Sequence, residues 1–279
     1  MGEERTENFG FGKLPSDLSS LSTSDLKQFL DSFFFMKFGP GALPNPGAME
    51  SRRIVVLLLP DEKLELAGPV IAHGYYALVQ DGCPSDFVLL FESESLEPYL
   101  VGELQDTPFG TVAKDASLYD SLRALCRNHI GTSVPEYVYH HILFVQAYCE
   151  SPRISVLAIP QQLGPDASFW KEFAERIQHR NIVVLALASL SHGDPHHRAR
   201  HKDWLTMEMI LKLDGPSTEK HFTRLRLKPS GKSVLLGGIE LARLMGAKQG
   251  HYIRYATTFD LGVSDNNSVI GLAALALVR

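Results

Sequence analysis

The sequence predicts an α/β fold with a central mixed or parallel β-sheet that is covered by helices on both faces. From residue 53 onward, strand-like segments alternate with segments of helical periodicity, which is the pattern of strands joined by crossover helices. The segment 181–188 is apolar on both of its faces, as expected for a central strand that helices bury on each side. The 279 residues are enough for one α/β domain of ordinary size.

Residues 1–20, rich in glycine, serine and charge, predict a flexible arm ahead of a single domain at 21–279. Apolar residues from Leu26 to Phe34 recur at helical spacing after a polar start at 22–25 and predict a helix. Glycine and proline at 38–48 predict a linker. The strands expected next are 53–59, 86–91, 153–159, 181–188, 251–257 and 268–278, and the helices are 68–80, 117–128, 135–149, 168–179 and 238–245.

Three further stretches carry patterns that resemble functional motifs. Basic residues alternate with leucine at 220–228, which favours a half-exposed strand. His196, His197 and His201 resemble a metal-ligand cluster with Asp194, but the neighbouring glycine and proline favour a solvated loop. The segment 228–233 ends like a phosphate-binding loop, yet Arg226 stands where that motif needs its first glycine.

Composition excludes several classes of protein. A formal charge of −5 and a pI of about 6.1 argue against nucleic-acid binding. The apolar runs are too short to cross a membrane. Cys83, Cys126 and Cys149 are odd in number and lack CxxC spacing, so neither a disulfide framework nor a cysteine zinc site is expected. With an acidic start that is no secretory signal, these features predict a reducing, cytoplasmic setting.

Polar residues follow three of the predicted strands, at Asp61-Glu62, at 92–95 and at 189–194. Ligands bind outside the carboxyl ends of strands in open α/β sheets. If the first and third of these strands are neighbours, Asp61 and His192 reach the same crevice. Carboxylates with imidazole suit Mn, Fe(II) or Zn, and His192 alone would serve as a general base. The alternative is that the acidic residues are solvated loop groups that cap helices.

The C-terminal segment resembles the signature of the Memo family, whose bacterial members are called AmmeMemoRadiSam system protein B. It consists of Tyr255-Ala256-Thr257-Thr258, the acidic loop at 265–267 and Ser268-Val269-Ile270-Gly271. Order and spacing are similar from about Leu26 to the end. The resemblance implies a fold like that of the class III extradiol dioxygenases, in which a metal site opens at the strand ends.

The motifs that carry the family's metal are altered in this chain. Asp61 replaces one histidine, Glu94 and Ser95 replace two others, and Ser189 replaces an aspartate, whereas His141 and His192 keep histidine. The family's late cysteine falls near Val234. The ligand-binding residues that the resemblance implies are Asp61, Glu94, Ser95, His141 and Ser189, and the implied metal ligands are Asp61, Glu94, His141 and His192.

Two hypotheses follow for the function, and a third is weaker. The first is a Memo-like protein with a degenerate metal site and no cofactor, which binds a small ligand, a peptide or a protein partner without catalysis. The second is a metal-dependent enzyme of dioxygenase or hydrolase type, in which a rebuilt carboxylate/His centre holds Fe, Mn, Mg or Zn and His192 is the base. The third is a subunit that completes a catalytic partner. Formation of a homo-oligomer stays open.

Overall fold

The computed structural model of the chain describes residues 18–45, 53–165 and 167–279. The strands are β1 Ile54–Leu59, β2 Asp86–Ser93, β3 Tyr99–Val101, β4 Ile130–Gly131, β5 Arg153–Pro160, β6 Ile182–Leu187, β7 His192–Asp194, β8 Gln249–Thr257 and β9 Val269–Val278. The helices are α1 Thr23–Phe35, α2 Leu64–Gln80, α3 Ala116–Leu125, α4 Glu136–Tyr148, α5 Ser168–Ile177, α6 His196–Leu211, α7 Gly215–Leu225 and α8 Lys232–Leu244.

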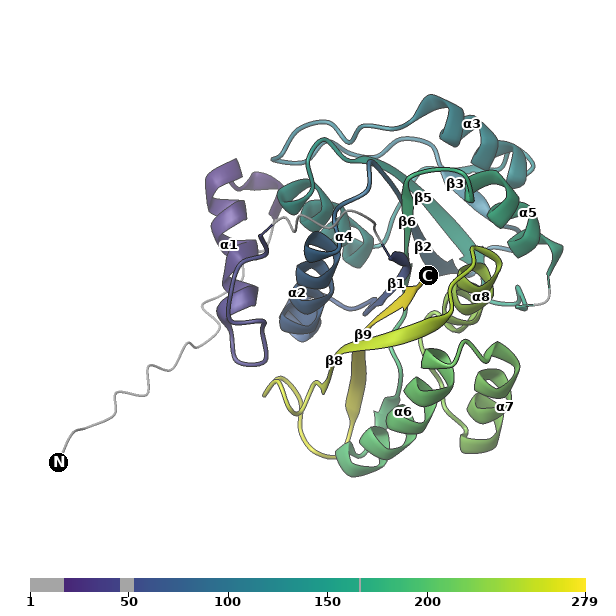
Figure 1. Ribbon diagram of the computed structural model, residues 1–279. Coiled ribbons are helices and arrows are strands. Elements are labelled where there is room, and N and C mark those ends of the chain that lie inside the picture. The colour runs from purple at the N-terminus through teal and green to yellow at the C-terminus, as the bar shows by residue number, and fades with distance from the viewer. Residues whose placement is uncertain (1–17, 46–52, 166) are drawn as a thin grey trace.

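The strands form one mixed sheet, ordered β4-β3-β5-β2-β6-β1-β9-β7, with β8 paired to β9 (Figure 1). Its centre is parallel, because β6 pairs in parallel with both β1 and β2, and β2 pairs in parallel with β5. β9 runs antiparallel to β1 and to β8. The predicted α/β fold with a mixed sheet is confirmed.

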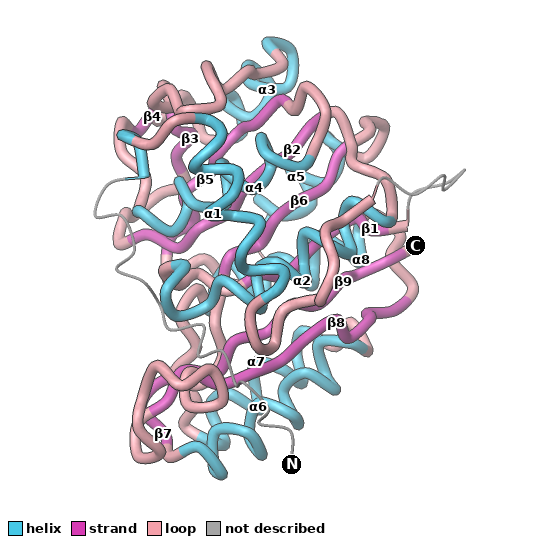
Figure 2. The backbone as a smooth tube through the Cα atoms, turned by 90° about the vertical axis from the view of Figure 1, so that its left-hand side faces the viewer, coloured by secondary structure: helices cyan, strands magenta, loops and turns pink. Residues whose placement is uncertain are grey.

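Helices cover both faces of the sheet (Figures 1 and 2). Successive side chains of a strand point to opposite faces, so Leu57 and Leu89 join one core with α1, α2 and α4. Val56 and Val88 join a second core, on the other face, with α3, α5, α6, α7 and α8. The parallel centre is therefore buried on both sides, which explains why β1 and β6 are apolar throughout.

The chain enters the domain through elements close to those expected. Leu18–Ser20 form a 3₁₀ turn, whereas the rest of the expected arm and residues 46–48 of the expected linker lie outside the described residues. The Ser22 hydroxyl caps α1 by accepting from the Asp25 amide at 3.1 Å. α2 begins four residues before the expected position. Gly68 lies inside it, where a Cβ atom would come within 2.3 Å of the Phe33 ring.

Two expectations about local structure were wrong. The histidines after Pro195 lie on α6, not in a loop, because this proline precedes the helix and fixes the turn at its start. The stretch 220–228 is not a strand, because α7 extends to Leu225. Asp214 begins α7 by accepting from the Ser217 amide at 2.9 Å, with a proline in the first turn.

The cysteines also depart from expectation. Cys83 and Cys149 form a disulfide across 66 positions of sequence, and Cys126 is free and buried. The sequence spacing gave no sign of this pair, because the two residues meet only when α4 packs beside α2. No helix in the described ranges combines the length and apolarity that a bilayer crossing requires.

Candidate functional site

The candidate site lies where three adjacent parallel strands end. β6 runs between β1 and β2, so the residues that follow these strands lie at one edge of the sheet. Asp61 follows β1, Glu92 lies near the end of β2, and Ser189 follows β6. From the sequence, Asp61 and His192 share a crevice only if the strands before them are neighbours. β1 and β6 are neighbours, so this condition is met.

Asp61 is held by Ser230, which also contacts the backbone of Ser189. The Ser230 hydroxyl donates to Asp61 Oδ1 at 2.6 Å and accepts from the backbone amide of Ser189 at 3.1 Å. Burial raises the pKa of Asp61, and the Ser230 hydroxyl partly offsets this rise by stabilising the carboxylate. Ser230, from the loop before α8, thus connects the ends of β1 and β6.

His192 pairs with the neighbouring carboxylate. Its Nε2 donates to Glu62 Oε1 at 3.2 Å. Burial lowers the pKa of His192, but the Glu62 hydrogen bond and the charges of Glu62 and Asp61 outweigh it, so the net direction is upward. The side chains of His192 and Glu62 stay 30% and 18% exposed, and a ligand in solution can therefore reach them.

Glu92 joins the sheet to the start of α8. Glu92 Oε2 accepts from the amide and the hydroxyl of Ser233, both at 2.8 Å. A carboxylate suits this position, because the first amides of a helix have no partner within the helix and carry its positive end. Gly231, the N-cap residue, provides no side-chain cap, so a residue distant in sequence takes that role.

Tyr137, at the start of α4, lies near the carboxylates. Burial raises the pKa of its phenol first, and the negative charges of Asp61, Glu92 and Glu62 raise it further. All three carboxylates thus lie near one aromatic side chain. We call Asp61, Glu62, Glu92, Tyr137 and His192 the strand-end cluster.

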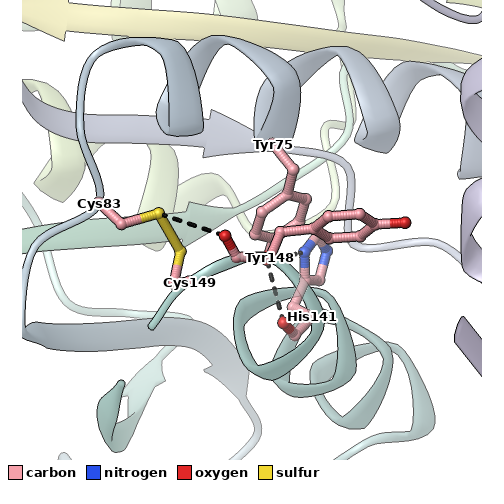
Figure 3. The surroundings of a disulfide bond; sticks show 5 residues. All are labelled: Tyr75, Cys83, His141, Tyr148 and Cys149. Carbon is pink, nitrogen blue, oxygen red and sulfur yellow. Dashed lines mark hydrogen bonds between the residues drawn. A yellow bond between two sulfur atoms is a disulfide. The ribbon is translucent and has the colours of Figure 1, made fainter. Parts of the chain in front are cut away.

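His141 lies beneath this cluster and is fully buried. Its Nε2 donates to the carbonyl of Pro60 at 2.9 Å, and the Tyr75 hydroxyl lies 3.1 Å from its Nδ1 (Figure 3). Burial lowers the pKa of His141 to about 4, although the Pro60 hydrogen bond counteracts the shift. Both ring nitrogens are engaged inside the protein, so this histidine positions β1 relative to α4.

Glu94 and Ser95 belong to the turn that follows β2. Glu94 is exposed. The Ser95 hydroxyl is 2.5 Å from that of Ser93 and donates to the carbonyl of Glu97 at 2.9 Å, which closes a local turn. Glu92, near the end of β2, is the glutamate that belongs to the cluster, and Glu94 belongs to a solvated loop.

The arrangement does not fit a metal ion as it stands. Within the described residues, no three His, Cys, Asp or Glu side chains form a group that could hold one. Asp61, His141 and His192 each bind a neighbouring group of the chain, and the Glu94 side chain is exposed to solvent. We therefore assign no chemical step to a metal.

Comparison with known proteins identifies the family. The family model described as "Memo-like protein" matches residues 20–276. The chain belongs to the Memo family. It is 27% identical to a MEMO1 family protein of Metallosphaera sedula, over 90% of this chain and 93% of the relative. It is 27% identical to one of Methanopyrus kandleri and 28% identical to one of Methanothermobacter thermautotrophicus, with 91% and 90% of this chain and 94% of each relative covered.

The C-terminal Memo signature has a structural role in this chain. The Tyr255 hydroxyl donates to Asp203 Oδ2 at 2.8 Å, and the Ser191 amide donates to Asp203 Oδ1 at 3.1 Å. A Cβ at Gly271 would lie 1.8 Å from Asp203 Oδ2, so glycine is required there. The signature residues therefore surround a buried carboxylate of α6 and fix the loop that carries His192.

Sequence reasoning missed several residues of the site. Ser230 and Ser233 flank the glycine of the failed phosphate-loop motif, and only that partial motif pointed to them. Tyr137 gave no signal, because its role depends on how α4 packs. Asp203 had none either, because the histidines at the start of its helix were expected to lie in a loop.

Proposed function

We propose that this Memo-like chain is a non-catalytic binding module, and that its strand-end cluster takes a small ligand or a peptide segment with a positive charge. The observation that supports it is that the groups a metal would need are already bound to the chain itself. Asp61 is held by Ser230, His192 by Glu62, and His141 by Pro60. A site of this kind recognises a ligand through its remaining lone pairs and charges.

The charge of the ligand follows from the residues that face it. Glu62 and Glu92 offer carboxylate oxygens, and Tyr137 adds an aromatic ring beside them. An ammonium or guanidinium group makes charge-assisted hydrogen bonds to carboxylates and is attracted to aromatic faces. The exposed fractions of Glu62 and His192 support approach of a ligand from the side of this pair.

Metal content tests the non-catalytic part. We expect that elemental mass spectrometry finds no stoichiometric Fe, Mn or Zn in chain purified without a His tag. A control variant, Glu94→Gln, should give the same result, because Glu94 lies outside the cluster. Stoichiometric metal that disappears in an Asp61→Asn, His192→Gln double variant would instead support the metal-dependent enzyme.

Thermal shift tests the charge of the ligand. We expect alkylamines and guanidines to stabilise the chain and carboxylates of matched size to leave it unchanged. At a concentration of one hundred times Kd, a ligand of the folded state adds about 2.7 kcal/mol of stability. Glu62→Gln should abolish the shift and Glu94→Gln should keep it. Equal shifts in these two variants would contradict binding at the cluster.

A further inference from the structure

The disulfide joins the ends of two helices that pack on the same face of the sheet (Figure 3). Cys83 lies in the loop after α2, and Cys149 is the C-cap residue of α4. Their Cα atoms are 5.7 Å apart. Tyr75 and His141 connect the same two helices nearer the site, so α2 and α4 are joined at two levels, one covalent and one polar.

Cys83 is the more accessible of the two cysteines in this bond. Cys83 is partly exposed and lines a cavity of about 490 Å³, together with Tyr148, Glu150 and Ser151. Cys149 is only 6% exposed. Cys126, by contrast, is buried in the core on the other face, where burial raises the pKa of its thiol to about 12. A small thiol therefore has access to Cys83 and not to Cys126.

The bond is also connected to the strand-end cluster through α4. Tyr148, next to Cys149, stacks on Phe144 and donates a hydrogen bond to Asp31 of α1 at 2.6 Å. Two turns before Tyr148, His141 donates to the carbonyl of Pro60, the residue that precedes Asp61. The position of α4 thus sets the position of the loop that carries Asp61 and Glu62.

We propose that Cys83 and Cys149 form a reversible redox site for low-molecular-weight thiols, and that opening the bond loosens α4 and the strand-end cluster. A thiolate attacks the Cys83 sulfur, the bond between the cysteines breaks, and Cys149 leaves as a thiolate that takes up a proton. A second thiol attacks the mixed disulfide and releases the Cys83 thiol. In total, two small thiols are oxidised to their disulfide and the cysteine pair gains two electrons and two protons.

Alkylation of the intact, folded chain tests the chemistry. In buffers of graded reduced and oxidised glutathione, we expect iodoacetamide to add two groups, at Cys83 and Cys149, as the buffer becomes reducing. Cys126 should stay unmodified until the chain unfolds, and excess oxidised glutathione should restore the bond. A bond that never forms, or one that opens only when the chain unfolds, would overturn the redox site.

Hydrogen exchange tests the connection to the cluster. In reduced chain, we expect amides of the last two turns of α4 and of the segment after β1 to exchange about tenfold faster, because α4 loses its covalent anchor. Amides of α5, on the other face of the sheet and without a contact to the cluster residues, serve as the internal reference and should not change. Cys83→Ser should exchange like reduced chain in every buffer, and Cys126→Ser should keep the response. Identical exchange in both redox forms of the wild type would refute the coupling, whatever binds at the cluster.

Discussion

At the scale of single residues, two fully buried titratable side chains change the stability of the chain in opposite directions as the pH rises. His141 is kept neutral, because burial lowers its pKa to about 4. Asp203 is kept closer to its protonated form, because burial raises its pKa to about 6, with Ser191 and Tyr255 counteracting the rise. Both residues affect stability between pH 4 and pH 7, and their two effects partly cancel in the wild type. A variant that removes one of the two residues should therefore reveal the effect of the other.

His141 should make the chain less stable in acid. In the unfolded chain a histidine takes up a proton below about pH 6.5, whereas folded His141 does so only near pH 4. The free energy of unfolding therefore falls as pH drops from 6.5 to 4, by on the order of 3 kcal/mol. Urea unfolding across this range should show a shallower fall in His141→Asn. The exposed-histidine variant His201→Asn should keep the wild-type slope, and an unchanged slope in His141→Asn would contradict the assignment.

Asp203 should act in the opposite direction. Between about pH 4 and 6 the folded chain holds a proton at Asp203 that the unfolded chain has released, so stability falls as pH rises through this window. The contribution is on the order of 3 kcal/mol. Asp203→Asn is nearly isosteric and cannot titrate. Its stability relative to wild type should therefore rise from pH 4 to pH 6, measured by urea unfolding, and a difference that is constant with pH would rule this out.

At the scale of elements, α8 shows how packing and the site are connected. Its N-terminus binds Glu92, and two consecutive glycines in its middle face neighbours at different distances. A Cβ on Gly237 would lie 1.9 Å from the buried Trp170 ring of α5, whereas a Cβ on Gly238 would lie 3.2 Å from the Ala186 Cβ in β6. The glycines allow α8 to approach both α5 and the sheet.

Alanine substitutions at Gly237 and Gly238 give a matched pair of variants. Gly237→Ala should destabilise the chain by about 1–3 kcal/mol, because a fully buried indole cannot yield without disturbing the core. Gly238→Ala should change stability by less than about 1 kcal/mol, because the gain in helix propensity offsets a small displacement. Denaturant titration of both variants gives the comparison. Similar losses in the two variants would show that the Trp170 contact is not decisive.

Element types were readable from the sequence wherever one periodicity ran through the whole element. The buried strands β1 and β6, and α5 with its apolar stripe, are of this kind. The end of α7 and the residues after it alternate basic and leucine over a short span, which resembles a strand, although Asp214 and Pro216 are signals of a helix start. β3, β4 and β7 have two or three residues each, too few for a pattern.

At the scale of the whole molecule, the order of strands in the sheet decides which polar residues meet. β6, distant in sequence from β1 and β2, lies between them, and this brings Ser189 and His192 to Asp61 and Glu62. Ser230 comes from the loop before α8 and Ser233 from its first turn, and α8 packs over the same strands. The residues that meet in these contacts are far apart in sequence, so local secondary-structure propensity carries no information about which of them meet.

The sequence by itself determined the α/β alternation, the Memo resemblance and the position of polar residues after three strands, because each is written in local periodicity or in contiguous motifs. Only the tertiary structure decided that Glu92 and not Glu94 joins the strand-end cluster, that Glu62 is the partner of His192, and that Cys83 meets Cys149. The physical reason is that side-chain direction at a strand end and contact between distant helices depend on packing across the sheet, which fixes register and orientation only after the whole core has assembled.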